Sequence, residues 1–354
     1  MRILLLGEYS GVHTNLGKAL RELGHEVMLV SDGDGYRDFP TDLKINTHRL
    51  SLASLYNDTS KPIKNYKKLI GFDAVQLIGP FIFNKKLPFY NELLIKHLKK
   101  DNGKLFLISA GSGYRYYESN RNLEYNPCIG CETIDKTNGC PYIKPYAKYS
   151  TKKIEEFSDK IIPLAYEYWM ANKDDPKCSS IHNYPIDTNR PIINEVGKKL
   201  IFFHGITEGR YGFKGSSQIQ IALEEAKKKY PNDIEVVIKG GLPYKDYIQL
   251  FNKVNVVVDQ LYSYSLAMNA LNAMCTGKIV LGGVEPIAYD HLNHKGVIPA
   301  FNITPSKNHI IKQVEAVLEN RYRIEELAKA SSDFVKKYFD NMVVAQHFLQ
   351  TWNS

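Results

Sequence analysis

The stretch KKLIFFHGITEGRYGFKGSSQIQIALEEAKKKY, residues 198–230, carries the patterns that decide the fold. Its first part, 198–205, contains a continuous apolar run, which is typical of a strand buried on both faces of a sheet. A glycine-rich segment follows, and apolar residues then recur at helical spacing. A buried strand, a glycine loop and a helix in this order indicate a parallel α/β sheet.

The glycine-rich segment EGRYGFKGS, residues 208–216, is a candidate phosphate site. Backbone amides and the helix dipole attract an anion to the start of a helix, and Gly215 lets the backbone come close to it. Arg210 would bind two phosphate oxygens at once, and Lys214 would add a point charge. A solvated surface turn would have the same residues, and the pattern GxxxxGK[ST] of ATPase-type phosphate loops is absent. On these residues alone both interpretations stay open.

The alternation of strands and helices continues towards the C-terminus. Strand patterns cover 234–241, 254–260 and 277–283, and helical patterns fill 309–353. Within 259–283, backbone amides at the start of a helix are candidates for binding further phosphate oxygens; they belong to Ser265, Leu266 and Ala267. Apolar side chains of this segment are expected in the core, namely Leu266, Leu271 and Met274.

The N-terminal part shows the same alternation. Strand patterns occur at 2–6, 25–30, 72–79, 103–109 and 159–164. The proline- and asparagine-rich segment 182–197 is interpreted as a linker. The patterns therefore predict two doubly wound α/β domains, at 1–184 and 185–335, with ligands bound in the cleft between them at the carboxyl ends of the strands.

The loop after the first strand holds the candidate residues of the first domain. Gly7, Glu8 and Gly11 lie in this loop and are candidates for lining the ligand cleft. His13 begins the next helix, where it would either contact a ligand as a catalytic residue or bond to the backbone. The loop lacks the pattern GxGxxG, so NAD binding is not predicted.

Residues 114–150 interrupt the alternation with an insertion, assigned to the first domain, that is rich in tyrosine, asparagine, proline and cysteine. Cys128 and Cys131 have the spacing of a metal knuckle, and Cys140 follows, so a structural zinc is one interpretation. A redox pair or local packing of thiols are the alternatives. The tyrosines of the insertion would stack on sugar rings, contact a membrane or pack the insertion itself.

Composition narrows the classes of function. The net charge of +8 suits a small anionic ligand or an anionic membrane surface, but no Lys/Arg block indicates nucleic-acid binding. No segment approaches the ~18 apolar residues of a membrane span. The first residues are interpreted as a buried strand and not a signal peptide, and five cysteines, an odd number, argue against a secreted disulfide scaffold. A cytoplasmic location is expected, with peripheral contact at the inner membrane left open.

The order of these motifs resembles the donor half of GT-B glycosyltransferases of the GT4-like family, also called glycosyltransferase group 1. In that family an Arg followed closely by Lys-Gly binds the donor diphosphate, and Arg210 with Lys214 and Gly215 matches this pattern. Gly240 and Gly241 occupy the place of the loop that covers the nucleotide base. LNAMCTGKIV, residues 271–280, matches the later helix and turn, and HNYPID resembles the interdomain linker. The resemblance covers most of the chain and is clearest over 182–283.

The sequence departs from the family pattern at three positions. The family carries a pair of glutamates, and Tyr264 and Asn272 stand in their places. Asn272 retains hydrogen bonds to ribose hydroxyls without the charge, whereas Tyr264 supplies no carboxylate. In the first domain, Gly113 stands where many relatives place His or Asp. Either the active site is built differently or catalysis is impaired.

The resemblance implies a GT-B architecture in which the last helix, 336–354, returns to the first domain. It also implies that Gly7, Glu8 and Gly11 lie on the acceptor side of the site. It implies transfer of a sugar, with retention, from a UDP- or GDP-type nucleotide sugar to a glycan or lipid-linked acceptor, as in cell-surface polysaccharide synthesis. Arg210 and Lys214 would neutralise charge on the leaving diphosphate, so no catalytic cofactor is expected. The alternatives are a catalytically impaired nucleotide-binding partner protein and a nucleotide-sugar epimerase.

Overall fold

The computed structural model describes the chain except for residues 46–58, 84–86, 132–139, 208 and 243. The chain divides into two compact units. The first unit comprises Met1–Glu118, Pro141–Pro185 and Asn341–Ser354, and the second comprises Ser119–Cys140 and Ile186–Asp340.

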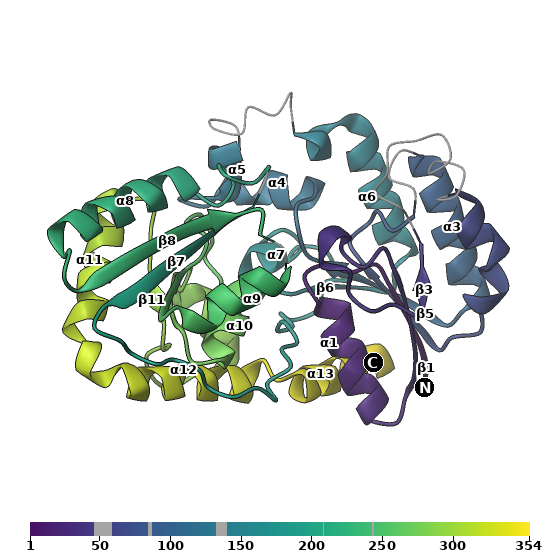
Figure 1. Ribbon diagram of the computed structural model, residues 1–354. Helices are drawn as coiled ribbons and strands as arrows, with labels where there is room; N and C mark the ends of the chain where they lie inside the picture. The colour runs from purple at the N-terminus through teal and green to yellow at the C-terminus, as the bar shows by residue number, and fades with distance from the viewer. Residues whose placement is uncertain (46–58, 84–86, 132–139, 208, 243) are drawn as a thin grey trace. The chain divides into compact units, whose positions relative to one another are not determined.

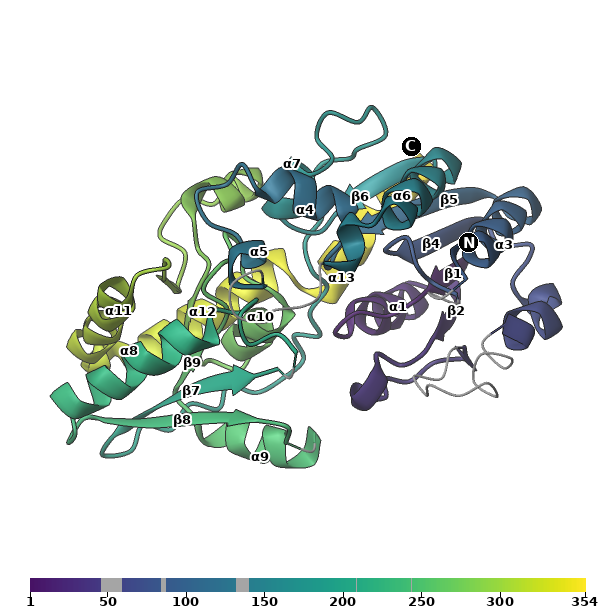
Figure 2. The same cartoon turned by 90° about the horizontal axis from the view of Figure 1, so that it is seen from above.

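The first unit is built on a six-stranded parallel sheet in the order β3-β2-β1-β4-β5-β6. Its strands are β1 (Arg2–Leu6), β2 (Glu26–Ser31), β3 (Leu43–Lys44), β4 (Ala74–Ile78), β5 (Lys104–Ser109) and β6 (Lys160–Pro163). Its helices include α1 (Val12–Glu22), α3 (Pro88–Asp101), α6 (Pro145–Phe157), α7 (Tyr166–Met170) and α13 (Asn341–Asn353). Right-handed crossovers run outward from β1 and β4 in opposite directions, so α1 and α3 cover opposite faces (Figure 2).

The second unit is built on a five-stranded parallel sheet in the order β11-β10-β9-β7-β8. Its strands are β7 (Leu200–Ile206), β8 (Ile234–Gly240), β9 (Val256–Val258), β10 (Ile279–Gly282) and β11 (Phe301–Asn302). Its helices include α8 (Ser216–Lys229), α9 (Tyr244–Lys253), α10 (Met268–Cys275), α11 (Lys307–Glu319) and α12 (Ile324–Tyr338). The helix α8 packs against α11 and α10 packs against α12, and helices lie on both sides of the strands (Figure 1).

The predicted fold class is confirmed, because both sheets are parallel and of the Rossmann-like type. Each strand pattern named above corresponds to a strand of these sheets. The sequence did not predict β3 and β11, which have only two residues each and lie at sheet edges. No helix in the described part of the chain is long and apolar enough to cross a membrane.

The insertion is divided between the two units. Helix α4 (Tyr114–Asn120) contains the transition, and Ser119–Cys140, with the short helix α5 (Pro127–Gly130), belongs to the second unit. The prediction had assigned all of 114–150 to the first domain. At the C-terminus, α13 belongs to the first unit, where it packs against α1.

Candidate functional site

The basic loop, residues 209–215, comes after the carboxyl end of β7, and its backbone is hydrogen-bonded. The Lys214 amide donates to the Arg210 carbonyl (3.1 Å), and the Leu261 amide donates to the Lys214 carbonyl (2.9 Å). Gly215 closes the loop with a φ of 71°, and a Cβ at this position would lie 2.7 Å from Leu261 Cβ. The basic loop and the loop after β9 therefore hold each other in place.

The two cations of the basic loop differ in their surroundings. Arg210 is exposed, and its guanidinium carbon lies 5.2 Å from the centre of the Phe213 ring. Among the described residues no carboxylate pairs with Arg210, so its charge is available to an anion. Lys214 is half-buried, and its charge helps to lower the pKa of the nearby His204.

Three backbone amides at the start of α8 donate hydrogen bonds within the protein. Ser216 donates to the Tyr211 carbonyl (3.0 Å), and Gln218 and Ile219 both donate to the Gly215 carbonyl (3.1 Å). The turn at Gly215 thus uses three of the amides that were expected to face a phosphate. An anion at this loop would be held mainly by the charged side chains.

His204 connects three elements beneath the basic loop. It is buried within β7, and its Nδ1 bonds to the carbonyl of Val258 in β9 (2.8 Å). Because a carbonyl only accepts, Nδ1 carries the proton, and Nε2 accepts from the Ser216 hydroxyl at the start of α8 (2.8 Å). Burial lowers the pKa of His204 to about 4, so the ring is neutral at neutral pH. Sequence reasoning missed His204, although a histidine inside an apolar strand is the signal that marks it.

The loop 261–267 is the second candidate segment, and it precedes α10. The Leu266 amide donates to the Tyr289 hydroxyl (2.7 Å), which itself donates to the Gly283 carbonyl (3.2 Å). The Ser263 hydroxyl donates to the Ser265 carbonyl (2.7 Å). The Leu266 amide is therefore engaged within the protein, and Ala267 is the residue that caps α10.

Tyr125 and Glu285, from distant parts of the chain, form a hydrogen bond beside this loop. The Tyr125 ring, from the insertion, lies 4.7 Å from the Tyr264 ring at an interplanar angle of 31°. The Tyr125 hydroxyl donates to Oε1 of Glu285 (2.6 Å), which also accepts from Nδ2 of Asn302 (2.7 Å). Sequence reasoning missed Glu285 and singled out Tyr125 only as one of several tyrosines.

The remaining candidates of the second unit are Asn272, whose side chain is hydrogen-bonded, and the exposed Gly240 and Gly241. Nη1 of Arg190 donates to Oδ1 of Asn272 (2.9 Å), and Nδ2 of Asn272 donates to the Met268 carbonyl (2.6 Å), so both amide atoms of Asn272 are engaged. Gly240 and Gly241 are exposed at the carboxyl end of β8, and Gly241 has a φ of 66°.

In the first unit, the Glu8 carboxylate caps α1. Its Oε1 accepts from the amides of Gly11 (3.0 Å) and His13 (3.3 Å), and its Oε2 accepts from the amide (2.7 Å) and hydroxyl (2.6 Å) of Thr14. Burial raises the pKa of Glu8, against the opposing effect of the Thr14 hydrogen bonds. The start of α1 therefore already holds a carboxylate of its own chain.

The His13 ring is fully buried in the first unit. Its Nδ1 donates to the Gly7 carbonyl (2.7 Å), and its Nε2 lies 3.4 Å from the Gln76 amide nitrogen. Gln76 also accepts from the indole nitrogen of Trp352 (3.0 Å). Burial lowers the pKa of His13 to about 4. Of the two roles considered for His13, the geometry favours bonding to the backbone, because the neutral ring supports the Gly7 turn from inside the fold.

The structure places no metal-ligand set in its described part: no three His, Cys, Asp or Glu side chains come together there as a metal site requires. Cys128, Cys131 and Cys140, the residues interpreted as zinc ligands, are thus not assembled around one point. All three are partly exposed in the second unit.

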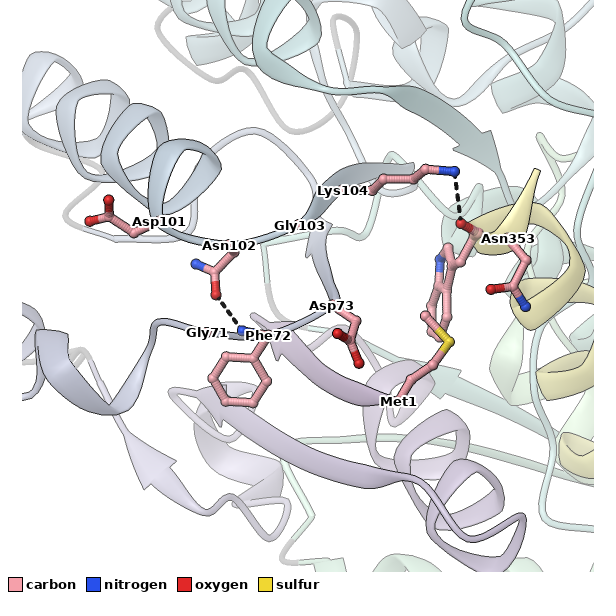
Figure 3. A pocket seen from close by; sticks show the side chains of 10 residues that line it. Met1, Gly71, Phe72, Asp73, Asp101, Asn102, Gly103, Lys104 and Asn353 are labelled. Atoms are coloured by element: carbon pink, nitrogen blue, oxygen red, sulfur yellow. Dashed lines mark hydrogen bonds between the residues drawn. The ribbon is translucent and has the colours of Figure 1, made fainter.

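A surface hollow in the first unit lies at the amino-terminal ends of its strands, away from their carboxyl ends (Figure 3). Asp73 and Lys104 line it, where β4 and β5 begin. Asp73 accepts from the Arg2 amide (2.7 Å), and Lys104 donates to the Ser354 carbonyl (2.7 Å). Ligands of parallel sheets bind at carboxyl ends, so this hollow is not the candidate site.

Comparison with known proteins gives matches in structure only. No family model matches the chain, and no curated protein sequence matches it. Sucrose-phosphate synthase from Thermosynechococcus elongatus is similar with a TM-score of 0.62 and 13% identity, over 100% of this chain and 98% of that chain. HepE of Anabaena, in complex with UDP-glucose, is similar with a TM-score of 0.62 and 12% identity, over 100% and 99% of the two chains.

A putative UDP-N-acetylglucosamine 2-epimerase from Listeria monocytogenes is also similar, with a TM-score of 0.55 and 12% identity over 98% of this chain and 94% of that chain. At these identities the likeness concerns the fold. The chain has the two-sheet, Rossmann-like fold found in GT-B glycosyltransferase structures.

Proposed function

We propose that the protein is a glycosyltransferase that uses a nucleoside diphosphate sugar as donor. The observation that carries the proposal is the basic loop 209–215, which comes after a parallel strand and presents Arg210 without a carboxylate partner among the described residues. A closely spaced Arg and Lys suit a diphosphate, because Arg binds two phosphate oxygens at once and Lys adds a point charge. The fold supports the same class, since the similar HepE structure is a complex with UDP-glucose.

In the proposed reaction, the chain's own residues stabilise the leaving group. Arg210 binds two diphosphate oxygens, and Lys214 adds a fixed positive charge where negative charge develops. Neutral His204 positions β7 and the start of α8 beneath both cations. We further propose that the donor is a UDP or GDP sugar, that the acceptor is a glycan or lipid-linked molecule, and that the transfer retains configuration. We also propose that the reaction needs no catalytic metal and that the protein is related to the GT4-like family.

Two alternatives share the same fold. A nucleotide-sugar epimerase would also bind the donor, and the Listeria structure is of that named type. A catalytically impaired partner protein would bind nucleotide without turnover, in keeping with Tyr264 in place of a glutamate. Turnover assays with and without an acceptor separate the three functions.

Arg210→Ala tests the proposal. We expect titration calorimetry to show that the wild-type protein binds UDP or GDP, and that the variant binds about 10- to 100-fold more weakly, as for a lost charge-assisted hydrogen bond. Arg323→Ala is the matched control, because that guanidinium pairs with Glu326 on the surface and should leave binding unchanged. Absence of binding by the wild-type protein to UDP, GDP and ADP would refute the proposal.

We further propose peripheral contact of the first unit with an anionic membrane surface. Phe89 and Leu93 on α3 are 74% and 55% exposed, and the Phe89 ring lies 6.3 Å from that of Tyr149 on α6. The exposed Lys96 and Lys100 follow on the same face of α3. Exposed apolar side chains beside lysines are typical of membrane-surface contact.

Replacing Phe89 and Leu93 together by aspartate is expected to weaken co-sedimentation with phosphatidylglycerol vesicles about tenfold or more, because apolar burial is lost and charge is added. Val297→Asp, at a 91% exposed position of the second unit, is the control. Equal vesicle binding by all variants would contradict this contact.

A further inference from the structure

The Glu285 carboxylate is held in one orientation at the carboxyl end of the second sheet. Glu285 follows β10, and its Oε1 accepts from the Tyr125 hydroxyl (2.6 Å) and the Asn302 amide (2.7 Å). Asn302 is itself fixed, because its Oδ1 accepts from the Val284 amide (2.8 Å). Two donors on one oxygen define the plane of the carboxylate.

The two hydrogen bonds to Oε1 also fix the position of the other oxygen, Oε2. Neither of these hydrogen bonds involves Oε2 itself. Within the described part of the chain Oε2 accepts no hydrogen bond and pairs with no cation. Glu285 is only partly buried, so Oε2 is able to accept a hydrogen bond from a ligand.

Glu285 also lies beside the position where a carboxylate was expected. Its amide donates to the Tyr264 carbonyl (3.1 Å), and the ring of Tyr125, which bonds to its side chain, packs against the Tyr264 ring at 31°. Tyr264 occupies the place of the first glutamate of the expected pair and has no acidic group at neutral pH. A carboxylate is therefore present in this region, supplied by another element.

We propose that Glu285 recognises the sugar of the donor by accepting hydrogen bonds from its hydroxyls through Oε2. Tyr125 and Asn302 act as positioning residues, since they hold the other oxygen. This inference rests on the proposed function and identifies the group that would distinguish a nucleotide sugar from the bare nucleotide. It also gives the part of the insertion around Tyr125 a role in the second unit.

The test compares the affinities for UDP and UDP-glucose, and for GDP and GDP-mannose, by calorimetry. For the pair that binds, Glu285→Gln should leave the affinity for the nucleotide within about twofold and weaken that for the nucleotide sugar about 10- to 100-fold. Tyr125→Phe should shift the ratio of the two affinities in the same direction by a smaller factor. A purely structural role would weaken both affinities equally.

Glu315 and Tyr230 provide a matched control in the same unit. The Tyr230 hydroxyl donates to Oε1 of Glu315 (2.9 Å), as Tyr125 does to Glu285, but Glu315 lies on α11. Glu315→Gln and Tyr230→Phe should leave the ratio of affinities unchanged. An unchanged ratio in Glu285→Gln, with nucleotide binding intact, would overturn the inference alone. Absence of nucleotide binding by the wild-type protein would overturn the proposed function and the inference with it.

Discussion

Gly130→Ala is expected to weaken nucleotide binding by about 100-fold or more, because displacing both cations of the basic loop costs about 1.5–3 kcal/mol for each charged hydrogen bond that is lost. A Cβ at this position would lie 1.9 Å from the carbonyl oxygen of Gly212 and 2.9 Å from Cε2 of Tyr262. The nearest obstacle is backbone, which cannot rotate away as a side chain does. Either α5 or the basic loop must therefore move, and Arg210 and Lys214 move with the loop.

Gly113→Ala is the control for this experiment. Nothing lies within 4 Å of a Cβ at Gly113, and its φ lies outside the left-handed region. Calorimetric titration of both variants with UDP and GDP, with thermal unfolding to verify folding, should show wild-type affinity for Gly113→Ala only. If Gly130→Ala bound nucleotide as tightly as the wild-type protein, the insertion would have no hold on the basic loop.

The fold was predictable because its signals are local. The apolar run at 198–205 and the helical spacing after Gly215 each lie within one window of sequence, and they predicted β7 and α8. Parallel sheets bury both faces of a strand, which makes such runs conspicuous. The short edge strands have too few residues to form a pattern.

The candidate site was only partly predictable because several of its contacts join distant residues. Tyr125 and Glu285 are 160 positions apart, and no local pattern connects them. The close fit of Gly130 against Gly212 likewise joins distant residues, and only the folded backbone defines it. For His13, the local pattern predicted its place at the start of a helix, but it did not predict the complete burial of the side chain.

The departures at Tyr264 and Asn272 have different structural consequences. Asn272 bonds to Arg190 and to its own helix, so its side chain serves the linker and α10. The Tyr264 ring packs against the Tyr125 ring at an interplanar angle of 31°, so an aromatic contact stands where the family pattern has a carboxylate. These exchanges agree with a site built from different residues, in which Glu285 provides the acidic group.

Gly283→Ala is expected to destabilise the protein by about 1–3 kcal/mol, as overpacking of a tight contact does, and to reduce turnover of the nucleotide sugar. A Cβ at Gly283 would lie 1.9 Å from the carbonyl oxygen of Ser263 and 3.0 Å from the carbonyl carbon of Tyr264. The loop 261–267 must then leave its place, and the hydrogen bond from the Glu285 amide to Tyr264 is lost with it. Urea unfolding and a sugar-transfer assay measure the two effects.

Gly282→Ala is the matched control at the neighbouring position. Its Cβ would first meet Cδ2 of Leu266 at 3.3 Å, the end of a flexible side chain, and no backbone atom lies among its nearest contacts. Its stability should therefore stay within about 1 kcal/mol of the wild-type value. Equal losses of stability in both variants would mean that the steric clash affects the end of β10 and not the loop 261–267, which would contradict the prediction. A loss confined to Gly283→Ala, in stability and turnover together, would show that the fixed loop 261–267 is a requirement of the reaction.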